Sequence, residues 1–426
     1  MKDKPLIVFV SAVYPSQYTL LCRHLREMDV AETWFFTTPG HVKRHAHEDD
    51  YLRAFQPDGP IVGQIGYYYS SKVERSARIG RGLIKALHQF EKEQGRPIDI
   101  VVSHSLWGAP NWLYSELQAA IVSYIEFPSY RTHGWDPAYP PDPAQRMGDR
   151  NTEMLNMHQV LCSDLTITPS AFARSMFPEA LQDRVAVQFE GFNISPPTAV
   201  TAPPPDRPFT VAFSARDLSS SKGLETFVRL VDRLVREGDA KAMRFLALGD
   251  PSASTYGYEQ QWVQRKYQHE PEDSPTKVKT FLDHLLRVYP AAAGVIEAPG
   301  KLPYDAFGAA ISEVDLFLYP LKYGVANWGL MEILARGSCV IGSNWGFVPE
   351  LITNDVNGVL LPDDDDQWIA TIRELKNDTE RRIRYRKAAA ELGQSYHISQ
   401  VAPLYMKLFE RALAQKKQRL AENRLW

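Results

Sequence analysis

Charged side chains stand at the ends of two apolar strands in the second half of the chain. Arg216 leaves the strand that begins at Thr210, Lys222 precedes the amphipathic helix that follows, and Glu332 lies in a short helix at 328–335. Open parallel sheets bind ligands at the carboxyl ends of their strands, where two fixed cations can stabilise the negative charge that develops on a diphosphate leaving group. The carboxylate of Glu332 can reach the sugar attached to such a phosphate. The pattern predicts a nucleotide site, with solvated surface charges as the alternative.

The segment around Glu332 has the pattern of one parallel strand-helix-strand unit. The strand 316–319 runs into a Gly-containing loop, the helix 328–335 follows, and Gly337 precedes a second strand at 338–343. Because the loop exposes backbone N–H groups at a helix N-terminus, it suits a phosphate. We therefore expect this loop to bind the nucleotide through the backbone of Ala326, Asn327, Trp328 and Gly329.

The run MEILARGSCVIGS, which begins at Met331, resembles the second half of the motif of the family-four retaining glycosyltransferases of GT-B fold. That half consists of a glutamate, a helix of small residues, a Gly turn and an apolar strand. The motif's first glutamate falls on Gly324, which has no side chain, so its contact with the donor sugar is expected from elsewhere, such as the backbone at 326–328. Trp328, four residues before Glu332, is similar to a bacterial branch of the family. An ordinary helix with a solvated glutamate is the alternative.

The resemblance implies roles for the charged residues. Glu332 would bind the ribose hydroxyls, and Arg216 and Lys222 would bind the diphosphate, although five residues separate these cations where the family usually has four. The turn after strand 295–298 resembles a stretch whose backbone borders the nucleotide base in relatives, and an ordinary Pro-Gly turn is a comparable interpretation. Further donor contacts are expected at Gly249, Gly300 and Leu302.

The first half of the chain resembles the acceptor-binding half of the same branch. Its first loop, PSQY, is similar to the branch's Pro-Gly-Gln-Phe loop, which implies that Ser16 and Gln17 line the cleft near the donor. His104 follows a strand's carboxyl end, where relatives place a histidine beside the reacting sugar, and a structural histidine is the alternative. Trp107 would form a wall for a sugar ring, with a buried aromatic residue as the alternative.

A loop after strand 121–125 carries polar and aromatic groups of the kind that commonly bind sugars. The run IEFPSYRTHGWDPAYPPD looks like the branch's Tyr-rich loop that ends in Asp-Pro. We predict that this loop binds the acceptor, and a structural loop held by its prolines is the competing interpretation. The predicted acceptor residues are Trp107, Tyr130, Arg131, His133 and Asp136.

Cations recur every three or four residues in SKVERSARIGRGLIKAL, so they lie on one helical face. Anionic lipid would attract such a stripe, at about 1 kcal/mol per charge near the membrane surface. A solvated helix face is the favoured interpretation, because Gly80 and Gly82 weaken the helix.

The composition sets limits on the class of protein. The 426 residues exceed what one hydrophobic core holds, so two or three domains are expected. The net charge of −3 argues against a general nucleic-acid partner. No apolar run approaches the roughly eighteen residues of a membrane span, and the amino terminus leads into a strand without a signal-peptide pattern. Cys22, Cys162 and Cys339 lie far apart without metal-ligand spacing. We expect a cytoplasmic protein, with peripheral contact at the inner membrane face left open.

The chain divides at its densest proline segment, residues 194–209, which is expected to be a semi-rigid linker. Strands alternate with helices on both sides of this linker. We predict an α/β protein of GT-B type, with two Rossmann-like parallel-sheet domains facing across a cleft. The acceptor domain would span 1–193 and the donor domain 210–399, and a helix within 400–426 would cross back to the first domain. Closure of such a cleft would exclude water from the transfer.

The resemblance implies a glycosyltransferase that moves a sugar from a nucleoside-diphosphate donor, with UDP as the first guess, to a hydroxyl group with retention of configuration. The acceptor would be a saccharide, a lipid-linked glycan or a small molecule. No metal or other cofactor is expected, because the cations supply the charge stabilisation. A nucleotide-sugar epimerase or a glycan phosphorylase would share the two-domain form. A catalytically silent subunit of a glycan assembly also stays open, because position 324 lacks a side chain.

Overall fold

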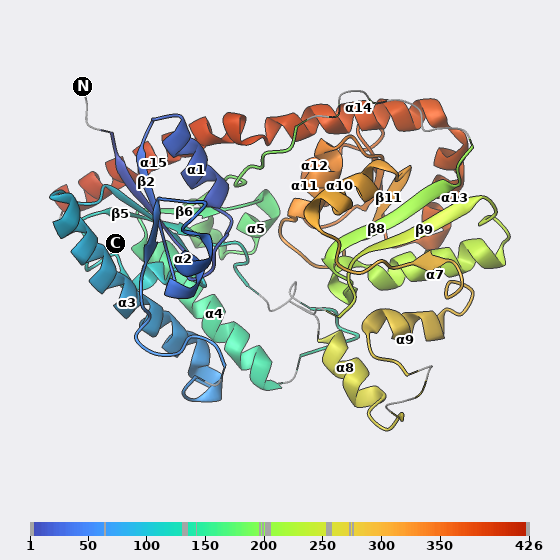
Figure 1. The fold of residues 1–426 in the computed structure, drawn as a ribbon, viewed down its shortest axis with the longest axis horizontal. Helices are drawn as coiled ribbons and strands as arrows, with labels where there is room; N and C mark the ends of the chain where they lie inside the picture. Colours follow the sequence, from blue (N-terminus) through green and yellow to red (C-terminus); the bar gives the residue numbers. More distant parts are fainter. Residues whose placement is uncertain are drawn as a thin grey trace. The chain divides into compact units, whose positions relative to one another are not determined.

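The computed structural model describes residues 4–422 apart from 64, 130–134, 142, 196, 198–199, 201–205, 253–257, 272–273 and 275–276. The chain forms two compact units, whose elements can be followed in Figure 1. The first unit comprises Met1–Arg131, Asp142–Asn193 and Tyr396–Trp426. The second comprises Thr132–Pro141 and Ile194–Ser395.

The first unit is built on an all-parallel sheet of seven strands. The strands are β1 (Leu6–Val10), β2 (Glu32–Thr37), β3 (Leu52–Ala54), β4 (Ile100–His104), β5 (Ala120–Tyr124), β6 (Leu165–Thr168) and β7 (Val185–Val187). Their order across the sheet is β3-β2-β1-β4-β5-β6-β7. The chain moves outward from β1 to β3 and then returns to β4 on the other side of β1. The connections after β1 and β4 therefore leave neighbouring strands at the carboxyl edge of the sheet.

Helices cover both faces of this sheet. They are α1 (Thr19–Glu27), α2 (Pro39–His45), α3 (Ser71–Gln94), α4 (Pro143–Cys162), α5 (Ala171–Ser175), α6 (Glu179–Gln182) and α15 (Ile398–Ala421), with the 3-10 turns η1 (Tyr68–Ser70) and η2 (Pro110–Trp112). Because side chains alternate across a strand, Ile7 and Phe9 lie in a core with α1 and α15, whereas Leu6 and Val8 lie in a core with α3. Both faces of β1 are thus buried, as is usual in parallel sheets.

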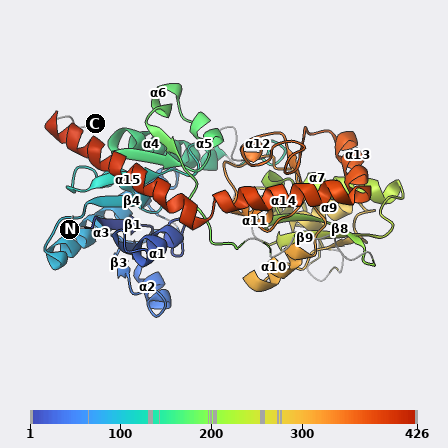
Figure 2. The same ribbon diagram turned by 90° about the horizontal axis from the view of Figure 1, so that it is seen from above.

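The C-terminal helix α15 belongs to the first unit, as predicted from the resemblance. Tyr405 and Phe409 are buried in the core that contains Phe9, and the ring centroids of Phe409 and Phe9 lie 6.3 Å apart. The Tyr405 hydroxyl also donates to the backbone oxygen of Gln188 at 3.1 Å. Figure 2 shows α15 lying over the strands of this unit. The last segment of the chain therefore completes the core of the first unit.

The second unit is built on an all-parallel sheet of six strands. The strands are β8 (Phe209–Asp217), β9 (Met243–Asp250), β10 (Ile296–Glu297), β11 (Leu316–Tyr319), β12 (Val340–Ser343) and β13 (Val359–Leu361). Its helices are α7 (Leu224–Arg236), α8 (Glu259–Lys266), α9 (Phe281–Val288), α10 (Tyr304–Ser312), α11 (Trp328–Ala335), α12 (Val348–Leu351), α13 (Asp365–Asn377) and α14 (Thr379–Ser395), with the 3-10 turn η3 (Ser220–Lys222). The two parallel sheets with their helices confirm the predicted fold class.

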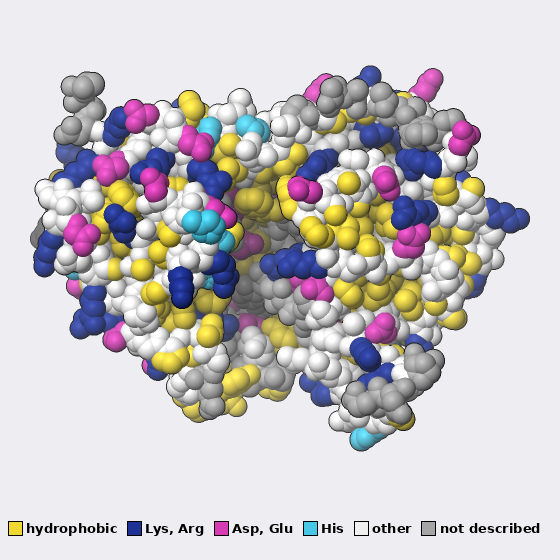
Figure 3. Space-filling view, in the orientation of Figure 1, with side chains coloured by type: hydrophobic (Ala, Val, Ile, Leu, Met, Phe, Trp, Pro, Cys, Tyr) yellow, Lys and Arg dark blue, Asp and Glu magenta, His cyan; other side chains and the backbone are white. Residues whose placement is uncertain are grey.

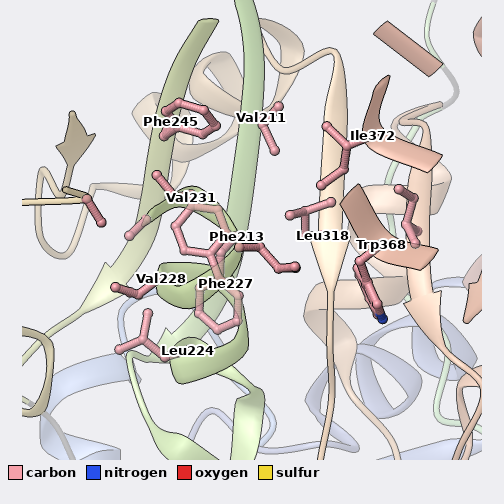
Figure 4. Close-up of a cluster of buried hydrophobic side chains, with 14 of the residues drawn as sticks. Val211, Phe213, Leu224, Phe227, Val228, Val231, Phe245, Leu318, Trp368 and Ile372 are labelled. Carbon is pink, nitrogen blue, oxygen red and sulfur yellow. The ribbon is translucent and has the colours of Figure 1, made fainter. Parts of the chain in front are cut away.

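The main core of the second unit joins its sheet to α7, α9 and α13 (Figure 4). Phe213 of β8 packs on Phe227 of α7, with ring centroids 5.6 Å apart. Leu318 of β11 and Trp368 of α13 are buried in the same cluster. Fully burying a side chain of this size contributes about 1.5–3 kcal/mol, so this cluster stabilises the strands that lead to the predicted nucleotide site.

The second unit includes a segment that the sequence analysis placed in the first domain. Thr132–Pro141 groups with the second unit, in contrast to the predicted domain 1–193. Tyr139 lies in the second unit's core, with its ring centroid 5.2 Å from Trp262 and 5.0 Å from Phe281. Burial of this aromatic ring is the physical reason for the placement, because a large apolar surface leaves water.

Helix α3 is continuous although it contains Gly80 and Gly82, which were expected to weaken it. A Cβ atom on Gly80 would lie 2.6 Å from the Cβ of Trp112, and one on Gly82 would lie 2.1 Å from a backbone oxygen. These glycines therefore permit close packing. The guanidinium of Arg75 lies 5.1 Å from the ring centroid of Trp107, so one cation of the predicted stripe is used inside the unit.

The surface carries charges of both signs. On the face drawn in Figure 3, Lys and Arg side chains are interspersed with Asp and Glu on both units. This mixing agrees with the small net charge of −3. None of the helices in the described part of the chain has the length and apolar character that a bilayer crossing requires.

The packing of α15 gives a prediction about the stability of the first unit. Phe409→Ala should destabilise that unit by about 3–5 kcal/mol, because it removes a buried aromatic ring. Leu404→Ala on the same helix is the control, because Leu404 is 43% exposed and should change stability by no more than about 0.5 kcal/mol. Hydrogen exchange of the β1 and β4 amides measures the stability of the first unit separately from that of the second. Equal protection of those amides in the two variants would contradict the assignment of α15.

Candidate active site

The centre of the second sheet has the topology of a ligand-binding site. Its strand order is β10-β9-β8-β11-β12-β13, so the chain moves outward from β8 and returns to β11 on the opposite side. The loops that follow β8 and β11 are therefore adjacent at the carboxyl edge. Ligands of open parallel sheets bind at this kind of switch point.

Backbone contacts join these two loops. The carbonyl oxygen of Ser221 accepts hydrogen bonds from the N–H groups of Lys322 at 3.1 Å and Tyr323 at 2.9 Å. Gly223 has a φ of +89°, and a Cβ atom there would lie only 1.9 Å from the carbonyl oxygen of Pro320. Only glycine fits such a close approach, so the contact requires the glycine at position 223.

The structure brings Lys222 to the position of the missing motif glutamate. The Nζ atom of Lys222 lies 3.7 Å from the point that a Cβ atom on Gly324 would occupy. Gly324 also has a φ of +153°, a conformation that residues with side chains rarely adopt. The conformation of this loop therefore depends on a glycine at position 324, and a glutamate there would strain the backbone.

Arg216 is the penultimate residue of β8, at the same sheet edge, and its side chain is largely in water. Its side chain is 68% exposed, and its Nε atom lies 3.2 Å from Oδ1 of the buried Asp217. Because the Arg216 side chain itself is mostly in water, its pairing with Asp217 is screened, so Arg216 can reorient toward a ligand at small cost. Gly249, at the end of β9, approaches the same strand, because a Cβ atom there would lie 2.1 Å from the carbonyl oxygen of Ala215.

The N-terminus of α11 is formed as the sequence predicted. Helix α11 runs from Trp328 to Ala335, and the side chain of Asn327 accepts a hydrogen bond from the N–H of Gly329 at 2.7 Å. Asn at this position is a favoured cap because it satisfies a helix N–H group. Trp328 is 42% exposed, and Ala326 is half-buried. The helix therefore directs its positive end toward the loop that follows β11.

Glu332 lies in a polar cluster that the sequence analysis did not identify. Its carboxylate accepts a hydrogen bond from Arg336 at 2.9 Å, and its side chain is 14% exposed. Arg336 in turn lies 5.8 Å from the ring centroid of Tyr304, the first residue of α10. The spacing of four residues between Glu332 and Arg336 could have indicated this pair from the sequence, because such residues face each other on a helix.

The predicted base-binding turn leads directly into that cluster. Gly300 has a φ of +79°, with no atom within 4 Å of the point that a Cβ would occupy, and Leu302 is half-buried just before α10. The structure thus connects this turn to Tyr304 and Arg336. No cluster of His, Cys, Asp or Glu that could hold a metal ion occurs among the residues described.

Asp136 lies in the second unit, next to the loop that follows β11. Its Oδ2 atom lies 3.4 Å from Nζ of Lys322, and its Oδ1 atom accepts the N–H of Ala138 at 3.0 Å. The contact with Lys322 spans 186 residues of sequence, so no local pattern could have indicated it. The other predicted acceptor residues on this loop, Tyr130, Arg131 and His133, lie outside the described residues.

His104 and Trp107 lie at the switch point of the first sheet. The carbonyl oxygen of Trp107 accepts the N–H of Ala12 at 2.7 Å, which joins the loops after β4 and β1. Nδ1 of His104 accepts the N–H of Leu106 at 3.1 Å, so the proton of the neutral ring is assigned to Nε2. Burial lowers the pKa of His104 from 6.5 to about 4, so this imidazole is neutral at pH 7.

The loop after β1 is held by its own polar contacts. The N–H of Ser16 donates to Oγ1 of Thr19 at 2.8 Å. Nε2 of Gln17 donates to Oε2 of Glu126 at 3.0 Å, which connects this loop to the residues that follow β5. Ser16 and Gln17 are therefore positioned at the carboxyl edge of the first sheet, and their predicted role near a donor stays a prediction.

Comparisons with known proteins were consistent with this architecture. Residues 31–196 match the family described as Glycosyl transferase family 4 group, and residues 292–392 match Glycosyl transferases group 1. WcaL of Escherichia coli K12, a glycosyltransferase assigned to colanic acid biosynthesis, is 24% identical over 195 residues, which is 44% of this chain. The matched stretch spans 41% of WcaL, so the chain matches about two fifths of the length of this relative.

Solved structures of similar fold cover nearly the whole chain. Sucrose-phosphate synthase of Thermosynechococcus elongatus has a TM-score of 0.67 at 15% identity over 96% of this chain and 100% of its own. HepE of Anabaena, solved in complex with UDP-glucose, has a TM-score of 0.62 at 13% identity over 95% of this chain and 99% of its own. These similarities show a GT-B fold. The two family matches and the similarity to WcaL support a glycosyltransferase of the family-four type.

The contact at Gly223 can be tested by substitution. Gly223→Ala should lower the stability of the second unit by about 1–3 kcal/mol more than Gly238→Ala, because its new methyl group meets the Pro320 carbonyl. Gly238 is a matched control: it has a φ of +82° at the other end of α7, with no atom within 4 Å of a new Cβ. Urea unfolding measured by hydrogen exchange of β8 and β11 checks this. Equal destabilisation by the two substitutions would contradict the loop contact.

The pKa of His104 predicts a pH dependence of stability. Between pH 6.5 and about 4, His104 is protonated in the unfolded chain but not in the folded protein. The free energy of unfolding therefore decreases as the pH falls through this range. The shift corresponds to roughly 3 kcal/mol. In His104→Asn, the slope of unfolding free energy against pH should decrease by about one proton in this range. His284, whose pKa burial also lowers to about 4, keeps its own contribution in both proteins. An unchanged slope would show that His104 titrates normally.

Proposed function

We propose that the protein transfers a sugar from a nucleoside-diphosphate donor to a hydroxyl group of an acceptor, with retention of anomeric configuration, during polysaccharide assembly. The two matches to glycosyltransferase family models support the reaction class. The assignment of WcaL to colanic acid biosynthesis supports the polysaccharide setting. HepE was solved with UDP and with UDP-glucose, so UDP is the first nucleotide to test.

The observation that carries the proposal is the junction of the loops after β8 and β11. It holds Lys222 against Gly324 and lies beside the capped N-terminus of α11. When the bond between the sugar and the diphosphate breaks, negative charge develops on the diphosphate. A fixed ammonium group and a helix N-terminus stabilise that charge, and Arg216 can add a second cation. In this proposal the reaction requires no metal ion.

Glu332 is proposed to bind the ribose hydroxyls of the donor. Its carboxylate can accept hydrogen bonds from hydroxyl groups on the oxygen lone pairs that Arg336 does not use. The pairing with Arg336 also fixes the side chain, so little rotational freedom is lost when the nucleotide binds. Glu332 therefore acts in binding, and Arg336 positions it.

His104 is proposed to donate a hydrogen bond from Nε2 to a hydroxyl of a bound sugar. Because the imidazole is neutral and its Nδ1 already accepts a backbone N–H, it is not suited to take up the acceptor's proton. In the proposed mechanism the departing diphosphate accepts that proton on the same face of the sugar. This route is consistent with retention and needs no carboxylate nucleophile.

The donor site is tested by two substitutions. Glu332→Gln and Arg216→Ala should each weaken UDP binding by about tenfold or more, since a hydrogen bond to a charged group contributes about 1.5–3 kcal/mol. Titration calorimetry gives the affinities. Glu380→Gln and Arg384→Ala, both on exposed positions of α14, are the matched controls and should bind UDP as the unchanged protein does.

Two results would contradict the proposal. The proposed donor site would be contradicted if both Glu332→Gln and Arg216→Ala bound UDP and other nucleoside diphosphates with unchanged affinity. Binding of nucleotide sugars without turnover, in the presence of a range of saccharide acceptors, would instead favour the second candidate, a catalytically silent subunit. That candidate is supported by Gly324, which contributes no side chain at the junction.

A further inference from the structure

Asp136 is a carboxylate that is held rigidly in the second unit. Its side chain is 7% exposed. Tyr139, three residues later, is buried in the core of that unit between Trp262 and Phe281. The N–H of Ala138 donates to Oδ1 of Asp136, which closes a local turn. The buried ring and the turn together fix where the carboxylate lies.

The position of Asp136 is next to the proposed diphosphate site. Oδ2 lies 3.4 Å from Nζ of Lys322. The N–H of Lys322 donates to the carbonyl of Ser221, which directly precedes Lys222 in the chain. Nearby Asp136 also contributes, after burial, to raising the pKa of Tyr323. Asp136 and Lys222 therefore border the same short loop, 322–324.

The negative charge of Asp136 would disfavour diphosphate binding at the neighbouring site unless a positive charge compensates it. Two like charges about 4 Å apart repel by about 4 kcal/mol near a protein surface. Lys322 supplies a compensating charge. A carboxylate only accepts hydrogen bonds, and it offers about four acceptor positions, of which the contacts with Ala138 and Lys322 occupy two. The neutral donor groups nearest to a bound diphosphate would be the hydroxyl groups of the sugar that it carries.

We propose that Asp136 binds a hydroxyl group of the donor sugar and so helps to select that sugar. Because Gly324 carries no side chain, Nζ of Lys222 lies 3.7 Å from the point where its Cβ would be, which leaves the ammonium group of Lys222 at this part of the loop. Lys322 offsets part of the negative charge of Asp136 through the ion pair. This inference rests on the proposed function, because it places the sugar next to the diphosphate.

The test compares affinity for UDP with affinity for UDP-sugars. Asp136→Asn should weaken binding of the preferred UDP-sugar by about tenfold and change binding of UDP by less than twofold. The preferred sugar is first identified with the unchanged protein from a panel of UDP-sugars. Asp183→Asn, on an exposed position of the first unit, is the matched control and should change neither affinity.

A second substitution separates sugar binding from a purely structural role. Lys322→Met removes the ion pair but leaves Asp136 in place. If Asp136 only holds its segment through Lys322, then Lys322→Met and Asp136→Asn will affect UDP and UDP-sugar alike, and the inference is overturned. If Asp136 binds the sugar, only Asp136→Asn shows the selective loss. Equal affinity of Asp136→Asn and the unchanged protein for the UDP-sugar would also overturn it.

The same binding measurements distinguish a wrong role for Asp136 from a wrong proposed function. If the unchanged protein binds UDP and UDP-sugars but Asp136→Asn shows no selective loss, only the role of Asp136 is wrong. If the unchanged protein binds no nucleoside diphosphate or nucleotide sugar at all, the proposed function fails and the role of Asp136 fails with it.

Discussion

The account depends on a backbone contact between two loops at the centre of the second sheet. The carbonyl of Ser221 accepts the N–H groups of Lys322 and Tyr323, and Gly223 allows the Pro320 carbonyl to approach closely. Because the contact involves main-chain atoms, it sets the place of the lysine between Ser221 and Gly223 before any ligand arrives. A charge held in place in advance stabilises a developing anion without reorganisation. The adjacent strands and the helices behind them serve to hold this junction.

Much of the fold could be predicted from the sequence, because the central strands are buried on both faces and consist of continuous apolar runs. The strand Leu316–Tyr319 and the helix Trp328–Ala335 have the predicted bounds. The sequence of the edge strand Leu52–Ala54 does not indicate a strand, because only its first residue is buried and it therefore shows no apolar pattern. Gly80 and Gly82 were misinterpreted, because the sequence shows the lost helix propensity of glycine but not the close neighbours that require it.

The candidate site was predictable where its residues follow one another along a strand-loop-helix unit. Lys222 and Glu332 belong to such units, and the structure places them at the predicted sheet edge and helix. Contacts between distant segments were not predictable. The ion pair between Asp136 and Lys322 connects residues 186 positions apart, and the packing of Tyr139 that brings it about depends on the whole core of the second unit. Such contacts arise from tertiary burial, which no local sequence pattern records.

The central claim is that a nucleoside diphosphate binds where the loops after β8 and β11 meet. Backbone hydrogen exchange with and without saturating UDP measures this directly, because each amide reports its own protection. The account predicts slower exchange in residues 219–223 and 324–329, with little change at the edge strand β13. Binding of UDP with unchanged exchange in both loops, and protection elsewhere in the chain, would contradict it.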